Sequence, residues 1–264
     1  MNNKGFKLAK KAFESRPRRF SILWMLPNFL TVCALIFGLQ AMYQALLGRW
    51  DNVIIMIIIA AVFDMLDGRV ARLLKSTSDF GMHLDSLSDF VVFGAVPAFS
   101  IFLWIGNPVN NLFWIVIVLY VICAALRLAR FNSELSERPS YAKNYFSGIP
   151  TPAAAFLLLL PIALENILEI TDFRSPEIIS FWIVVISIGM VSNLPTFSGK
   201  VFQIPKSLVI PMLVILALLS NAIISNPIKG FTILVLIYLI SIPFATLFYI
   251  RLKKKEEALQ AKVE

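Results

Sequence analysis

The feature that constrains this chain most is a series of apolar stretches, each about as long as a bilayer is thick. Between residues 26 and 250, charged residues, prolines and glycines separate runs near the roughly 20 residues that a helix needs to cross the hydrocarbon. Because no water is available there, backbone groups must pair within each segment, so we expect helices. The expected spans, about eight, are residues 26–47, 52–73, 83–105, 111–131, 149–168, 178–194, 207–224 and 229–250.

The composition places the chain in the class of all-α, polytopic membrane proteins. Of the 264 residues, 58% are hydrophobic and only 15% charged, more apolar surface than a water-soluble domain needs. We expect a basic N-terminal tail (1–24) with no signal peptide, one transmembrane domain (25–250) and a charged C-terminal tail (251–264). Cys33 and Cys123 lie inside apolar runs, which argues against a disulfide or a thiolate metal site.

The distribution of basic residues predicts the orientation in the membrane. With eight spans both termini lie on one side, and 21 of the 24 Lys and Arg residues then share that side. Only Arg49, Arg174 and Lys229 lie on the other side. Since basic loops stay in the cytoplasm, both termini are expected to be cytoplasmic, in a protein of the cell membrane. The basic residues are spread over many segments, which argues against nucleic acid as a partner and suits contact with anionic lipid.

Four aspartates lie in or beside the second and third expected spans. Asp64 and Asp67 are three residues apart and share a helix face, and Asp85 and Asp89 are four residues apart. A short turn joins the two spans, so the carboxylates should converge near the cytoplasmic end of a hairpin. Their repulsion would be relieved by hard divalent ions such as Mg²⁺ or Mn²⁺, and two such ions can serve phosphoryl transfer. The alternative is an ion or proton pathway, as in a transporter.

The segment 64–89 resembles the signature of the CDP-alcohol phosphotransferase family, integral-membrane enzymes of phospholipid head-group synthesis. It reads D-x2-D-G-x2-A-R-x8-G-x3-D-x3-D without a departure. The matching residues are Asp64, Asp67, Gly68, Ala71, Arg72, Gly81, Asp85 and Asp89. The resemblance implies that Asp64, Asp67 and Asp85 bind a pair of Mg²⁺ or Mn²⁺ ions. It further implies that Asp89 contributes to the second metal and acts as general base.

The same resemblance implies a set of residues that bind the nucleotide of a CDP-linked donor. Gly68 lets a ligand approach the helix backbone, and Arg72 offers a cationic fork for a phosphate, although it also suits a positive-inside anchor. Asn28 and Thr31, in "PNFLT", resemble a family element beside the nucleotide, although polar groups at a helix start are common. The expected donor-binding residues are Asn28, Thr31, Gly68, Ala71, Arg72, Ser78 and Gly81.

Three polar segments on the expected cytoplasmic side resemble the phosphatidylserine synthase branch of the family. They are "ALRLARFN" (125–132), "FSGIPTPAAA" (146–155) and "MVSNLPTFSGK" (190–200). That resemblance implies CDP-diacylglycerol as donor and L-serine as acceptor; Ile149 and Thr151 are mild departures from it. Arg127 and Arg130, three residues apart, and Asn132 are candidates for acceptor binding. Their guanidinium groups suit a carboxylate or the donor's diphosphate, and they also suit positive-inside anchors.

Several alternatives stay open from the sequence. A sister enzyme would use glycerol phosphate, inositol or inositol phosphate as the acceptor, and an ion-coupled transporter would release no CMP. Direct displacement at phosphorus and a covalent phosphatidyl-enzyme are both compatible with the residues. A homodimer is one compatible assembly, and the sequence does not decide the oligomeric state.

Overall fold

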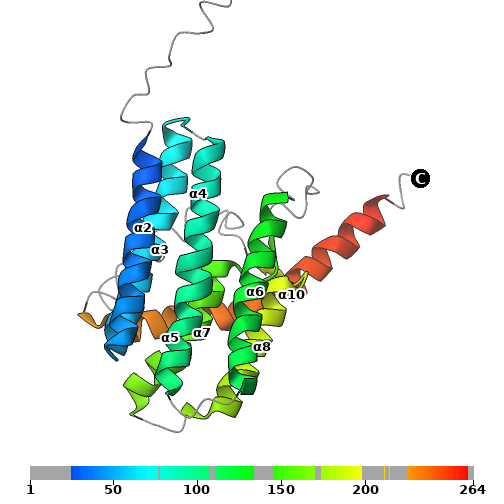
Figure 1. Cartoon of the computed structure of the whole chain (residues 1–264). Helices are drawn as coiled ribbons and strands as arrows, with labels where there is room; N and C mark the ends of the chain where they lie inside the picture. Colours follow the sequence, from blue (N-terminus) through cyan, green and yellow to red (C-terminus); the bar gives the residue numbers. More distant parts are fainter. Residues whose placement is uncertain are drawn as a thin grey trace, which may run out of the picture.

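The structure, a computed structural model, describes residues 25–76, 78–106, 111–133, 145–169, 174–197, 211, 214 and 225–260. Helices dominate this part of the chain, and α2 to α6 stand side by side as a bundle (Figure 1). The elements in chain order are α2 (Leu26–Leu46), α3 (Trp50–Leu73), α4 (Asp79–Asp89), the π-helical segment η2 (Phe90–Ala95), α5 (Val96–Ile105), α6 (Asn111–Ser133), β1 (Tyr145–Ser147), α7 (Thr151–Leu168), α8 (Pro176–Val191), β2 (Pro195–Phe197) and α10 (Pro227–Gln260).

Within the described residues, each helix lies on an expected span, and only α10 extends far beyond one. The expected span 207–224 and the tail 1–24 lie outside the described residues, so the count of eight and the side of the termini stay predictions. Within the described residues, five helices are long and apolar enough to cross a membrane. They are Leu26–Leu46, Asp79–Ile105, Asn111–Ser133, Thr151–Leu168 and Pro227–Leu247.

Two helices fall outside that group for different reasons. The second half of α3 carries Asp64, Asp67 and Arg69, which lower its apolar character. The apolar helix α8 has only 16 residues. At the other extreme, α10 continues to Gln260, beyond the expected end at residue 250. The described part of the chain is therefore mostly helical and apolar, and within α3 the charge is concentrated in the second half.

Small residues occur in the turn after α2 and along much of the buried face of α2. Gly48 has φ +67° in the turn between α2 and α3, a conformation that glycine adopts without strain. Small residues repeat along the buried face of α2, which allows close approach of neighbouring helices. These residues are Ala34, Gly38, Ala41 and Ala45. A Cβ atom at Gly38 would lie only 2.6 Å from Val92 Cγ2. The stripe therefore holds α2 close to the helix that carries Asp85 and Asp89.

Prolines free two backbone carbonyls inside the bundle, and aromatic side chains of neighbouring helices bind both. Pro97 has no N–H for the carbonyl of Phe93, four residues earlier; that oxygen accepts a hydrogen bond from Tyr120 Oη at 3.0 Å. Pro161 likewise frees the carbonyl of Leu157, which accepts from Trp182 Nε1 at 2.9 Å. Since buried polar groups need partners in an apolar bundle, these bonds fix α6 against α4–α5 and α8 against α7.

A short β-ladder joins the start of α7 to the end of α8. β1 and β2 pair antiparallel, with Tyr145 opposite Phe197 and Ser147 opposite Pro195. Gly148 follows with φ +75°, and its N–H donates to the Leu194 carbonyl at 2.8 Å. A Cβ atom at Gly148 would contact the backbone carbonyls of this link, so only glycine fits. The ladder places the segments 146–155 and 190–197 together beside the end of α6.

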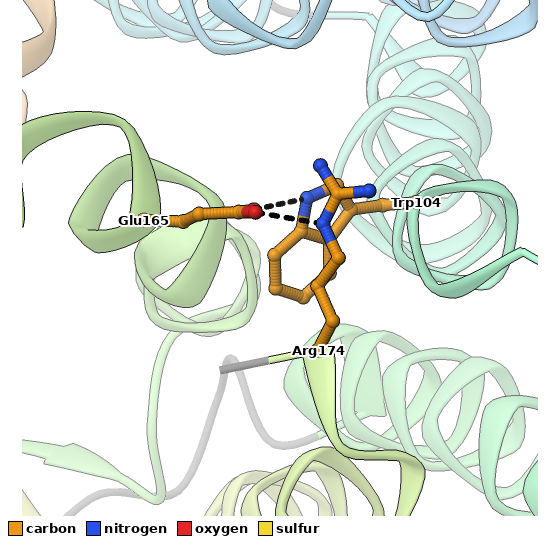
Figure 2. A network of polar contacts seen from close by, with 3 residues as sticks. All are labelled: Trp104, Glu165 and Arg174. Carbon is orange, nitrogen blue, oxygen red and sulfur yellow. Dashed lines mark hydrogen bonds and ion pairs between the residues drawn. The ribbon is translucent and has the colours of Figure 1, made fainter. Parts of the chain in front are cut away.

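A polar cluster joins α5, α7 and the segment before α8 at the end of the bundle where α2 turns into α3. Glu165 accepts from Trp104 Nε1 at 2.8 Å and pairs with Arg174 Nε at 2.7 Å (Figure 2). The Arg174 guanidinium also lies over the Trp104 ring, 5.5 Å from its centroid, a favourable cation–π arrangement. We call Trp104, Glu165 and Arg174 the outer clasp. It borders a cavity of about 580 Å³ that Arg49 and Asp51 also line.

Candidate active site

The hairpin of α3 and α4 brings the four aspartates together. Carboxylate oxygens of Asp64, Asp67 and Asp85 all lie within 4.8 Å of one another. Asp89 stands beside this triad, with its carboxyl group close to that of Asp64. We call these four residues the aspartate cluster. The convergence follows from the spacing in sequence, since i, i+3 and i, i+4 pairs face each other across a hairpin.

The aspartate cluster has the chemistry of a site for hard cations. Asp67 is 4% exposed, and Asp89 Oδ1 is buried with no hydrogen-bond partner among the described residues. In the part of the chain that the structure describes, no Lys or Arg forms an ion pair with these carboxylates. Oxygen donors alone, gathered this closely, fit Mg²⁺ or Mn²⁺ and do not suit softer metals. The residues present therefore fit the divalent ions that the sequence implies.

Thr31 of α2 orients one carboxylate of the cluster. Its hydroxyl donates to Asp67 Oδ2 at 2.5 Å, and its backbone carbonyl accepts from Ser88 Oγ at 3.4 Å. Thr31 therefore links α2 to both arms of the hairpin. Residues that hydrogen-bond metal-binding carboxylates fix their orientation. The sequence suggested Thr31 only as a nucleotide contact, and this second contact was not anticipated.

All seven expected donor-binding residues line one cavity of about 550 Å³. The cavity also borders Asp67 and Asp85, so it opens directly onto the aspartate cluster. Its lining is Pro27, Asn28, Thr31, Asp67, Gly68, Ala71, Arg72, Ser76, Ser78, Asp79, Gly81, Met82 and Asp85. We call it the donor cavity. Residues from three helices, far apart in sequence, thus form one wall beside the carboxylates.

Two of the lining residues also have local structural roles. Ser78 is the N-cap of α4, where its hydroxyl accepts from the Gly81 N–H at 3.0 Å, satisfying one of the free donors at the helix start. A Cβ atom at Gly81 would lie 2.8 Å from Asn28 Oδ1. Gly81 therefore allows α2 and α4 to meet, and Asn28 takes its position in the cavity wall from that contact.

The candidate acceptor residues of α6 lie outside the lining of the donor cavity. Arg127 is buried and donates from Nη1 to Thr151 Oγ1 at 2.5 Å. Arg130 donates to Asn193 Oδ1 and to the carbonyl of Val191. These bonds bring together the three polar segments that the sequence grouped, at the β-ladder. Sequence reasoning missed Asn193, which belonged to a quoted segment but carried no charge to single it out.

Asn132 connects this acceptor side to the aspartate cluster. Its Nδ2 donates to Ser86 Oγ at 2.9 Å, and Ser86 is the neighbour of Asp85 in α4. The end of α6 therefore reaches α4 next to Asp85, which also lines the donor cavity. Lys143 and Lys200, further candidates for an acceptor carboxylate, lie outside the described residues.

Comparisons with known proteins agree with this arrangement. The model of the CDP-alcohol phosphatidyltransferase family matches residues 24–193, more than half of the chain. Similar proteins named CDP-diacylglycerol–serine O-phosphatidyltransferase come from Mycobacterium tuberculosis (H37Rv), 34% identical over 87% of this chain and 81% of the relative, and Helicobacter pylori (26695), 31% identical over 83% and 89%. A third, from Methanocaldococcus jannaschii, is 35% identical over 66% and 76%. With six of the eight signature residues lining one cavity, the chain belongs to the CDP-alcohol phosphatidyltransferase family.

Proposed function

We propose that this protein transfers the phosphatidyl group of CDP-diacylglycerol to the hydroxyl of L-serine, giving phosphatidylserine and CMP. The observation that carries the proposal is the donor cavity, whose lining joins all seven expected donor-binding residues to the aspartate cluster. The printed names of the relatives support serine as the acceptor. The polar segments that resemble the phosphatidylserine synthase branch meet beside Arg127 and Arg130.

The proposed setting is a cell membrane, with the reaction at its cytoplasmic face. The excess of Lys and Arg on one side supports an eight-span topology with both termini in the cytoplasm. In that orientation the aspartate cluster lies near the cytoplasmic ends of α3 and α4, and the outer clasp lies on the opposite side. CDP-diacylglycerol would keep its acyl chains in the bilayer while its nucleotide enters the donor cavity.

Two divalent ions would be held by the aspartate cluster. Asp64, Asp67 and Asp85 supply the triad of oxygen ligands, and Asp89 is proposed to serve the second ion. When bound, such ions neutralise the carboxylates and stabilise the charge on the phosphoryl oxygens. Thr31 holds the Asp67 carboxylate in place through their hydrogen bond.

The chain's own residues supply the proton transfer and the positioning. Asp89 is proposed to accept the proton of the serine hydroxyl as its oxygen attacks the phosphorus that bears the diacylglycerol. A new P–O bond to serine forms, the P–O bond to CMP breaks, and CMP leaves with the bonding electrons. Arg72, in the lining, is proposed to hold a phosphate of the donor. We propose direct displacement; a covalent phosphatidyl-enzyme is the alternative route.

The acceptor is proposed to approach from the side of α6. Serine carries a carboxylate and an ammonium group, and Arg127, Arg130 and Asn132 are the candidates for holding it. The contact of Asn132 with Ser86 brings this end of α6 beside Asp85. Arg127 and Arg130 would then hold the carboxylate directly or position the groups that do.

The experiment that tests the proposal measures CMP release by the purified protein from CDP-diacylglycerol with Mg²⁺ or Mn²⁺ and a panel of alcohols. We expect rapid release with L-serine and little with glycerol phosphate, inositol or inositol phosphate. Faster release with one of these acceptors would reassign the substrate within the family. No release with any alcohol, together with ion uptake into vesicles that contain the protein, would replace the enzyme by a transporter.

A further inference from the structure

Ser76 carries a buried hydroxyl group for which the described part of the chain offers no partner. The residue is 4% exposed, and its Oγ has no hydrogen-bond partner among the described residues. Burying an unpaired hydroxyl costs on the order of 1–3 kcal/mol, and most buried polar atoms in proteins are paired. Such a group therefore requires a physical reason.

The backbone at the end of α3 directs Ser76 inward. Lys75 has φ +49°, the left-handed conformation that often ends a helix. The Ser76 N–H then donates to the Ala71 carbonyl at 3.0 Å, and the Lys75 N–H to the Arg72 carbonyl at 3.3 Å. In this Schellman arrangement the residue in the place of Ser76 usually packs an apolar side chain on the residue in the place of Ala71. Here a polar side chain takes that place.

The location of Ser76 supplies the reason. Ser76 lines the donor cavity together with Gly68, Ala71 and Arg72, the part of the wall that α3 provides. The other hydroxyl of this turn, Ser78, already accepts a hydrogen bond from the Gly81 N–H as the cap of α4. Among the described residues, nothing uses the donor and acceptor of Ser76, a residue that lines the cavity we propose for a nucleotide.

We propose that Ser76 is a further binding residue for the donor, and that its hydroxyl hydrogen-bonds the cytidine nucleotide in the donor cavity. The inference rests on the proposed function. In this reading the chain accepts an unpaired hydroxyl in the free state because the nucleotide supplies its partner. Ser76 is no part of the D-x2-D-G-x2-A-R signature; burial, pairing and position alone single it out.

The test is CMP binding, measured calorimetrically on the full-length protein in detergent, with Ser76→Ala as the variant. We expect Ser76→Ala to weaken CMP binding roughly tenfold, the effect of one hydrogen bond. The free variant should unfold at the same temperature as the parent or at a higher one, because the unpaired oxygen is gone. Ser187→Ala is the matched control: Ser187 is also buried but donates to the Ile183 carbonyl at 2.7 Å in α8. It should unfold at a lower temperature and bind CMP as the parent does.

The possible outcomes distinguish the role of Ser76 from the proposed reaction. Unchanged CMP affinity in Ser76→Ala, with the parent binding CMP, would overturn the role of Ser76 and leave the proposed reaction intact. A marked fall in the unfolding temperature of the free variant would also overturn it, since the hydroxyl would then have a partner in the protein. Failure of the parent both to bind CMP and to release it from CDP-diacylglycerol would instead contradict the proposed function.

Discussion

Glu165 and the aspartate cluster are two acidic sites at opposite ends of one bundle, and they differ in what completes them. Glu165 pairs with Arg174 at 2.7 Å and accepts from Trp104 at 2.8 Å. The aspartate cluster has Thr31 as a donor, but no ion pair within the described residues. α3 joins the two regions: Asn52 borders the outer cavity and Asp67 lies 15 residues later, about 22 Å along the axis.

The difference separates a structural acid from a functional one. The outer clasp is satisfied by the protein itself, so its charge contributes to folding. The aspartate cluster leaves mutual repulsion, and a buried Asp89 oxygen that no described residue pairs, for a bound cation to satisfy. Removal of a negative charge at the aspartate cluster should therefore raise the unfolding temperature of the metal-free protein, whereas removal at the outer clasp should lower the unfolding temperature.

The largest effect is expected from removing divalent ions. Excess EDTA should abolish CMP release, because the carboxylates alone would repel a diphosphate, and added Mg²⁺ or Mn²⁺ should restore it. The measurement is CMP release from CDP-diacylglycerol and serine before and after each addition. Full turnover in EDTA would contradict a divalent-metal site at the aspartate cluster.

The next largest effect on CMP release is expected from Asp89→Asn. The variant keeps the shape and one oxygen but loses the proposed base, so we expect CMP release to fall by about 10²-fold or more. Binding of CDP-diacylglycerol should be largely retained. In EDTA the variant should unfold at a higher temperature than the parent, because one source of repulsion has gone.

Asp51→Asn is the matched control for that experiment. Asp51 lies on the same hairpin but at the outer end, where it accepts from Asn166 Nδ2 at 2.9 Å. Its replacement should leave CMP release unchanged. Near-parental turnover in Asp89→Asn would show that another group takes the proton.

Arg127→Lys and Arg130→Lys should have a smaller effect that is specific for the acceptor. Lysine keeps the charge but loses the planar fork that reaches Thr151 and Asn193. We expect the KM for serine to rise about tenfold, the loss of one good hydrogen bond, with little change in kcat or in affinity for CDP-diacylglycerol. Arg72→Lys should show the reverse pattern, with weaker affinity for CDP-diacylglycerol and an unchanged KM for serine. An unchanged serine KM in both α6 variants would place the carboxylate elsewhere.

The aspartate hairpin could be predicted from sequence because its spacing repeats with the helix turn. Asp64, Asp67, Asp85 and Asp89 meet as that spacing requires. The described helices begin and end within a few residues of the expected spans, except that α10 continues to Gln260. Both results depend on local periodicity, which one sequence displays directly. The number of spans depends also on residues 207–224, outside the described part.

Contacts between distant segments could not be predicted in the same way. Nothing in the sequence pairs Glu165 with Trp104 or Arg130 with Asn193, since each pair is separated by about sixty residues. The lack of a partner for the Ser76 hydroxyl among the described residues is equally invisible in the sequence, because it depends on how the helices pack. The proline-freed carbonyl of Phe93 was foreseeable from Pro97, but the Tyr120 hydroxyl that binds it was not.

The smallest effect, and the sharpest test of the contrast, is expected from Glu165→Gln. Glutamine can still accept from Trp104, so the main loss is the charge facing Arg174. Because the Arg174 side chain is 44% exposed, water screens that pair and the loss should be modest, on the order of 1 kcal/mol in the free energy of unfolding. Thermal unfolding in detergent should therefore shift slightly downward, while CMP release stays at the parental level. The expected shift in unfolding temperature is opposite in direction to that of Asp89→Asn in EDTA. If Glu165→Gln instead lost CMP release as Asp89→Asn does, the outer clasp would be coupled to the reaction, and the division of the bundle into a structural and a functional end would be wrong.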